Sequence, residues 1–141
     1  MIVLLAALLA LAEGPAPAPA PDGTLAPDPI TYEQMVKCAG VFRLASVLAR
    51  GDREAEQAQA AATSAVAYQH LAYLYGRAQG VDQAAVDDAI TASATGQALT
   101  YATSIRTPAQ RRLAESVMAT DRQVCVIVSE RVARELGAGS E

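Results

Sequence analysis

The sequence predicts an all-α fold: an antiparallel up-down-up-down four-helix bundle that follows a Pro/Ala-rich N-terminal tether. Apolar residues recur at helical spacing in four successive stretches. Capping residues, glycine or proline bound these stretches, and the connections between them are short, as expected for antiparallel neighbours. The chain has 141 residues, which is the size of one domain.

The N-terminus has the pattern of an export signal. Residues Ile2–Leu11 are apolar without interruption, and Ala10-Leu11-Ala12 has the small-x-small form of a signal-peptidase site, so we predict a signal peptide over residues 1–12. A helix over the apolar run would reach about 15 Å, half of a bilayer core, so we expect no stable membrane span. No Lys or Arg precedes the run, which leaves open a hydrophobic N-terminus that docks on the domain.

Residues 13–30 are predicted to be a linker. Proline and alanine alternate over residues 15–21, and Asp28-Pro29 follows. Because proline lacks a backbone donor and favours extended polyproline geometry, this stretch cannot join a helix. It is typical of a semi-rigid spacer in front of a folded domain, which we place at residues 31–137, with a flexible tail at 138–141.

The first helix is expected from Thr31 to about Arg50. Thr31 and Gln34 fit a capping box, in which each side chain satisfies one free backbone N–H, and Gly51 can close the helix in the left-handed conformation. Helical spacing predicts one buried face, made of Met35, Cys38, Ala39, Phe42, Ala45 and Ala49.

A second, Ala-rich helix is expected from an Asp52 cap to about Gln79, closed by Gly80. We predict that its core side gathers Ala62, Val66 and Tyr73. A neighbouring stripe is a candidate contact face, because exposed tyrosines are favoured at protein interfaces. The alternative is that one broad helix face is buried inside the monomer. The stripe consists of Tyr68, Leu71 and Tyr75.

The third helix is expected from an Asp82 cap to about Ile105, with a break near Gly96, because threonines and glycine there are poor helix formers. Its predicted inner face consists of Val86, Ile90, Tyr101 and Ile105.

The last helix has the best-defined start in the chain. Thr107 is a cap, Pro108 occupies the first helical position and Gln110 the third, and the helix is expected to reach Leu136 and to stop at Gly137. Its alternating arginines and glutamates are typical of a solvated face.

Alanine supplies 32 of the residues. Small inward side chains let helix axes approach to about 8 Å, so we expect a narrow bundle without a cofactor cavity.

The two cysteines are predicted to form a disulfide. Cys38 and Cys125 lie on apolar stripes of the first and last helices, at depths that an antiparallel pair can bring together. An exported protein normally oxidises an even number of cysteines. The alternative is that both are small buried hydrophobes.

His70 is the only histidine and therefore the only candidate for a cofactor ligand or a catalytic base of a triad. One alternative function is a small haem- or ligand-binding bundle in which His70 is the axial ligand and Met35 or Met118 lies opposite. There is no Cys-x-x-Cys-His motif for covalent haem attachment, and our expectation is no cofactor and no metal.

Charge and composition narrow the classes of function that the protein can have. Three of the 15 acidic residues, Glu13, Asp22 and Asp28, precede the bundle, which leaves 12 acidic against 11 basic residues. A nearly neutral domain lacks the clustered basic face that nucleic acid requires. Neighbouring carboxylates such as Asp87 and Asp88 face different sides of a helix, and phosphate-binding glycine loops are absent, so we do not expect an enzyme.

The resulting hypothesis is a non-enzymatic helical module in the bacterial periplasm or outside the cell. The Ala/Arg-rich composition is similar to that of small exported proteins of bacteria with high genomic G+C content. Such a module would act through contact with a protein partner or with itself, as an inhibitor, an immunity-type protein or an assembly factor.

Overall fold

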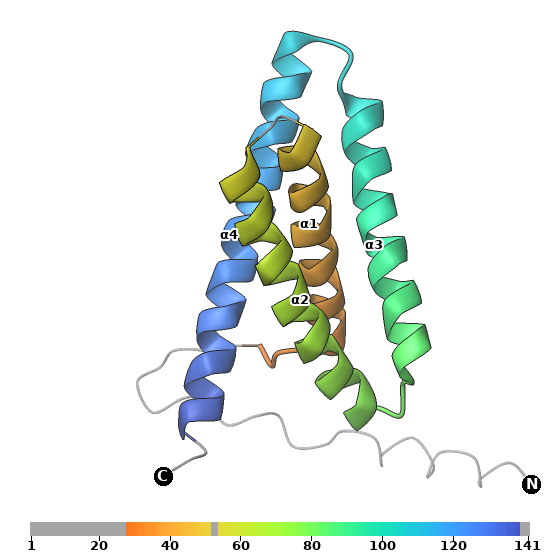
Figure 1. Ribbon diagram of the computed structural model, residues 1–141, viewed down its shortest axis with the longest axis vertical. Coiled ribbons are helices and arrows are strands. Elements are labelled where there is room, and N and C mark those ends of the chain that lie inside the picture. The colour runs from red at the N-terminus through yellow and green to blue at the C-terminus, as the bar shows by residue number, and fades with distance from the viewer. Residues whose placement is uncertain (1–27, 52–53, 139–141) are drawn as a thin grey trace, which may run out of the picture.

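The computed structural model describes residues 28–51 and 54–138, and their fold is a bundle of four helices. The helices run alternately up and down, which confirms the predicted up-down-up-down topology (Figure 1). The predicted signal peptide and residues 13–27 of the linker lie outside the described residues, as do residues 139–141 of the tail. The helices are α1 (Tyr32–Gly51), α2 (Ala55–Ala78), α3 (Gln83–Ser104) and α4 (Pro108–Ala138).

The first helix, α1, is the centre of the bundle. It contacts each of the other three helices, and it contacts α2 and α3 more extensively than α4. In Figure 1, α2 lies in front of α1, while α3 and α4 stand on its two sides and meet at the turn that joins them. The arrangement is therefore less regular than a square four-helix bundle, because α4 is attached mainly through one face of α1.

Three predicted helix starts are present. The Gln34 backbone N–H donates to the Thr31 hydroxyl and the Thr31 N–H donates to the Gln34 amide, which completes the capping box. The Asp82 carboxylate accepts from the N–H of residue 85 at 2.8 Å. The Thr107 hydroxyl accepts from the Gln110 N–H, but the Gln110 side chain accepts from the backbone of residue 106 rather than from that of Thr107.

The predicted helix ends are less accurate. Among the described glycines only Gly80, at φ 78°, adopts the left-handed conformation. Gly51 and Gly137 instead belong to the last turns of α1 and α4, and α3 continues through Gly96 without the expected break. Backbone hydrogen bonds outweighed the low helix propensity of the α3 threonines, and Thr100 and Thr103 also donate their hydroxyls to the carbonyls four residues earlier.

The second helix also starts differently from the prediction. The expected cap, Asp52, lies outside the described residues, and α2 begins after Glu54, whose side chain makes no capping hydrogen bond. The first turn of α2 therefore lacks the side-chain cap that the other helix starts possess.

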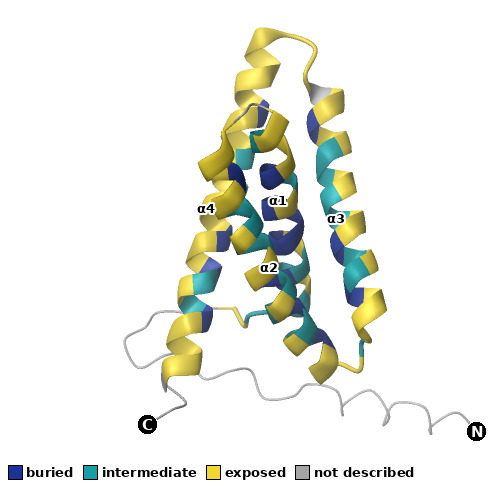
Figure 2. Cartoon of the chain, viewed as in Figure 1, coloured by how far each residue is buried: buried dark blue, intermediate teal, exposed yellow. Residues whose placement is uncertain are grey.

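The core confirms most of the predicted inner positions, corrects two of them, and contains one residue that was predicted to lie on an outer face. Val66 and Ile105, predicted to lie inside, are 65% and 37% exposed, whereas Tyr68 is only 4% exposed. Rotation of α2 explains the errors at Val66 and Tyr68, because Ala58, Tyr68 and Ala72 define its buried side, whereas Ile105 lies at the end of α3. Buried positions concentrate on α1 and on the sides of the other helices that face it (Figure 2). The buried cluster consists of Met35, Cys38, Ala39, Val41, Phe42, Tyr68, Ala72, Val86, Ile90, Cys125, Val128 and Val132.

Helices α1 and α3 approach each other closely at Gly40. A Cβ at this position would lie 2.6 Å from the Ser93 hydroxyl oxygen and 3.0 Å from a backbone nitrogen of α3. Gly96, by contrast, has open space where a Cβ would stand. Gly40 is therefore required by packing, and Gly96 is not.

We expect Gly40→Ala to lower the free energy of unfolding by about 1–3 kcal/mol, since overpacking forces the two helices apart. Gly96→Ala is the matched control and should raise it by up to about 1 kcal/mol, because alanine is the better helix former. Urea unfolding followed by circular dichroism measures both. Adding Ser93→Gly to Gly40→Ala should recover part of the loss, and equal effects of the two single changes would contradict the close approach.

None of the described helices combines the length and the apolarity needed to cross a membrane.

Candidate functional site

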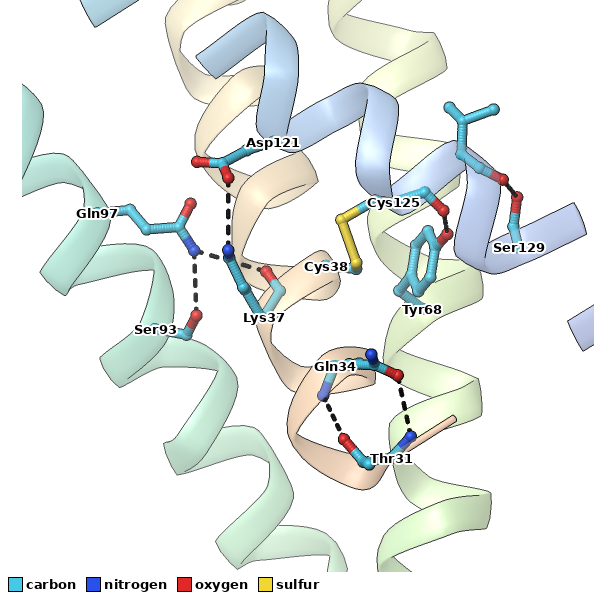
Figure 3. The surroundings of a disulfide bond; sticks show 11 residues. Thr31, Gln34, Lys37, Cys38, Tyr68, Ser93, Gln97, Asp121, Cys125 and Ser129 are labelled. Carbon is cyan, nitrogen blue, oxygen red and sulfur yellow. Dashed lines mark hydrogen bonds and ion pairs between the residues drawn. A yellow bond between two sulfur atoms is a disulfide. The ribbon is translucent and has the colours of Figure 1, made fainter. Parts of the chain in front are cut away.

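Cys38 and Cys125 form a disulfide that joins α1 to α4 across 87 positions of the chain, as predicted (Figure 3). Their Cα atoms are 5.5 Å apart, and the residues are 2% and 0% exposed. A bridge buried in this way is shielded from thiols in solution. We therefore assign it a structural role.

Tyr68 lies beside this disulfide, which overturns its assignment to an exposed contact stripe. Its ring stacks on Phe42 with centroids 5.7 Å apart, and its hydroxyl donates to the carbonyl of Cys125 (Figure 3). Burial raises the pKa of the Tyr68 phenol above its ordinary 10.0. Leu71 and Tyr75, the other members of the expected stripe, are half-buried and pack against the core. Tyr68 therefore belongs to the core, and Leu71 and Tyr75 lie at its border.

The possible haem ligands do not converge. His70 is exposed on α2, whereas Met35 is completely buried in the core and Met118 lines a surface depression beside Leu48 and Glu54. Within the described part of the chain, no group of three or more His, Cys, Asp or Glu side chains is placed to hold a metal ion. The geometry therefore offers no support for the cofactor alternative.

A polar cluster fastens α2 to α3. The Asp87 carboxylate accepts hydrogen bonds from the Tyr73 hydroxyl and, at 2.8 Å, from the Gln69 amide. Hydrogen bonds from Tyr73 and Gln69 hold the pKa of Asp87 below its ordinary 3.8. Arg43 of α1 donates to Thr91 nearby. Each polar group has a partner within the monomer, so the cluster is structural.

A second polar cluster joins α1, α3 and α4. Asp121 accepts from the Tyr101 hydroxyl at 3.1 Å and pairs with Lys37 at 3.4 Å. Gln97 donates to the Lys37 carbonyl and to the Ser93 hydroxyl (Figure 3). Burial, reinforced by Asp121, raises the pKa of Tyr101 to about 12, so this phenol stays protonated at physiological pH. Lys37 is largely exposed, and its ion pair therefore contributes little to stability.

The fourth helix carries two parallel apolar stripes, of which only one is covered. The covered stripe faces the core and includes Ala114, Cys125, Val128 and Val132. The uncovered stripe lies one residue earlier along the helix, rotated by about 100°, and its spacing again alternates four and three residues. We call it the outer seam; it consists of Leu113, Val117, Thr120, Val124 and Ile127.

The outer seam is exposed along its whole length. Its four large apolar residues, Leu113, Val117, Val124 and Ile127, are 65%, 46%, 50% and 49% exposed. Leu113 and Val117 border a depression of about 330 Å³, whose opposite wall is formed by Thr100 and Tyr101 of α3. Single apolar residues scattered on a surface are ordinary, whereas these four share one face of one helix, so the outer seam is the candidate contact surface.

Sequence reasoning missed the outer seam although its signal was present. The charged residues Arg111, Arg112, Glu115 and Arg122 directed the interpretation of the last helix toward a solvated face. Testing the same helix for a second four-three repeat, offset by one residue from the first, identifies the seam.

No protein-family model matches this chain, and neither the curated proteins nor the solved structures contain a significant match to it.

Proposed function

We propose that the protein is an exported, non-enzymatic helical module that acts through protein–protein contact, and that its contact surface is the outer seam of α4. The observation that carries this proposal is the row of half-exposed Leu113, Val117, Val124 and Ile127 on one helix face. A row of this kind suits helix-to-helix docking, in which an apolar face packs on a partner at positions spaced three and four residues apart.

Two further features support export. The Cys38–Cys125 disulfide suits an oxidising compartment, since cytosolic thiols are normally kept reduced. The apolar Ile2–Leu11 and the alternating Pro/Ala residues that follow it have the composition of a signal and a spacer.

Export is tested by expressing the chain from its own start codon in a bacterial host and recovering the periplasmic fraction. Intact mass with and without thiol alkylation should show loss of the first twelve residues and no free thiol. Retention of Met1 together with two reactive thiols would refute export.

The contact surface is tested in the same fraction by the size of the complexes that contain the protein. Val117→Asp with Val124→Asp should weaken binding about 100-fold or more, because charges cannot be buried unpaired in an apolar contact. Val66→Asp with Leu74→Asp is the matched control, since these α2 residues are 65% and 55% exposed and lie outside the seam. If the complexes were lost in the α2 control and kept in the α4 variant, the outer seam would not be the contact surface.

A further inference from the structure

We infer that the outer seam binds a second copy of the same chain, with the two α4 helices antiparallel and crossing at Thr120. This inference rests on the proposed function and names the partner of its contact surface. The seam residues follow one another at intervals of four, three, four and three, which is the repeat of a two-helix coiled-coil seam. From Leu113 to Ile127 the seam is about 21 Å long, at 1.5 Å per residue.

The outer seam is complementary to itself in the antiparallel orientation. A two-fold axis at Thr120 brings Leu113 opposite Ile127 of the second copy, and Val117 opposite Val124. Thr120 meets its own counterpart at the centre, where its hydroxyl is already bonded to the carbonyl of Ser116. Every layer therefore pairs residues of similar size, as a two-fold contact made by the same surface on both copies requires.

Charge also favours the antiparallel orientation. Ser116 and Gln123, which flank the centre of the seam on its outer side, are uncharged. The charged residues next to the seam are Arg112 at one end, Glu130 and Arg131 at the other, and Asp121 beside Thr120, where it forms an ion pair with Lys37 of the same chain. Parallel helices would place Glu130 and Arg131 beside their own counterparts, whereas antiparallel helices place them at the opposite end of the second copy's seam, where Arg112 can offset the charge of Glu130. Like charges facing one another across such a seam are destabilising.

The shape of the α3–α4 pair leaves room for α4 of the second copy to approach the outer seam. The two helices meet at their connecting turn and separate away from it (Figure 1). Tyr101 donates to Asp121 in the half near the turn, and Val124 and Ile127 lie beyond this link. In the antiparallel pair, the exposed Val124 and Ile127 of one copy meet the depression that Leu113, Val117 and Tyr101 border in the other.

The test is cysteine cross-linking of the full chain together with its native mass. Purified protein should have twice the monomer mass, and Val117→Asp with Val124→Asp should return it to the monomer mass. Under mild oxidation, Thr120→Cys should cross-link to itself. Leu113→Cys alone should not, but mixing it with Ile127→Cys should give a cross-linked pair. The native disulfide is too buried to exchange, and Val66→Cys on α2 is the control that should stay uncross-linked.

Three outcomes would overturn the inference. Cross-linking of Leu113→Cys to itself would show a parallel pair, and cross-linking of Val66→Cys alone would place self-association on α2. A purified chain that stays monomeric at high micromolar concentration would exclude a second copy as the occupant. If that monomer still formed seam-dependent complexes in the periplasmic fraction, the proposed function would stand with a different protein as its partner. Unchanged thermal melts of the cysteine variants would show that each result reports on contact and not on folding.

Discussion

Replacing Cys38 and Cys125 together by alanine is expected to lower the free energy of unfolding by about 4 kcal/mol. The bridge spans 87 positions, so its removal returns a large conformational freedom to the unfolded chain. The expected loss is a large fraction of the 5–15 kcal/mol that stabilises a typical domain. Guanidinium unfolding of the oxidised protein and the double variant measures the difference.

Two controls separate the cross-link from packing. Wild-type protein reduced with a thiol under unfolding conditions lacks the bridge but keeps both sulfur atoms, so the difference between its midpoint and that of the double variant measures the packing of the two sulfurs. Ala45→Gly, at a buried position of α1 away from the bridge, should cost only about 1 kcal/mol. A double variant within about 1 kcal/mol of the wild type would mean that packing alone holds α4 on α1.

Tyr68→Ala is expected to destabilise the protein by about 3–5 kcal/mol, which is the usual cost of deleting a buried aromatic side chain. The change removes the stack on Phe42 and leaves the Cys125 carbonyl without its phenol donor. Thermal and urea unfolding of the oxidised protein measure the effect.

The matched comparison for Tyr68 uses two other variants. Tyr68→Phe keeps the ring and should lose only about 1 kcal/mol for the hydrogen bond. Val66→Ala, two residues away on the exposed side of α2, should change stability by less than about 0.5 kcal/mol. The opposite ranking, with Val66 more costly than Tyr68, would show that α2 is rotated from the orientation described here.

The sequence predicted the helices well because their starts are determined locally. Thr31, Asp82 and Thr107 each satisfy a backbone N–H within their own first turn, so no knowledge of the rest of the fold is needed. The Cys38–Cys125 pairing was also predictable, since two cysteines permit one intramolecular bridge and antiparallel topology places them at similar depth.

The face that α2 buries could not be predicted from local signals of this kind. Alanines surround this helix on several sides, so the apolar pattern defines a broad arc instead of a narrow stripe. The choice between Val66 and Tyr68 depended on a distant partner, because Phe42 and the Cys125 carbonyl provide the stacking surface and the acceptor that Tyr68 needs. The outer seam was overlooked for a related reason, since charged neighbours on α4 obscured a second apolar repeat.

The central position of α1 has a consequence for the order of folding. Helices α1, α2 and α3 make the more extensive contacts, and they precede α4 in the chain. A chain that emerges N-terminus first can therefore pack these three helices while Cys38 still carries a free thiol. Oxidation must wait for Cys125, and closing the bridge fixes the last helix to a scaffold that already exists. Over-oxidation of Cys38 to the sulfinic or sulfonic acid before Cys125 arrives would block that final step, because neither form reacts with a thiol to give a disulfide.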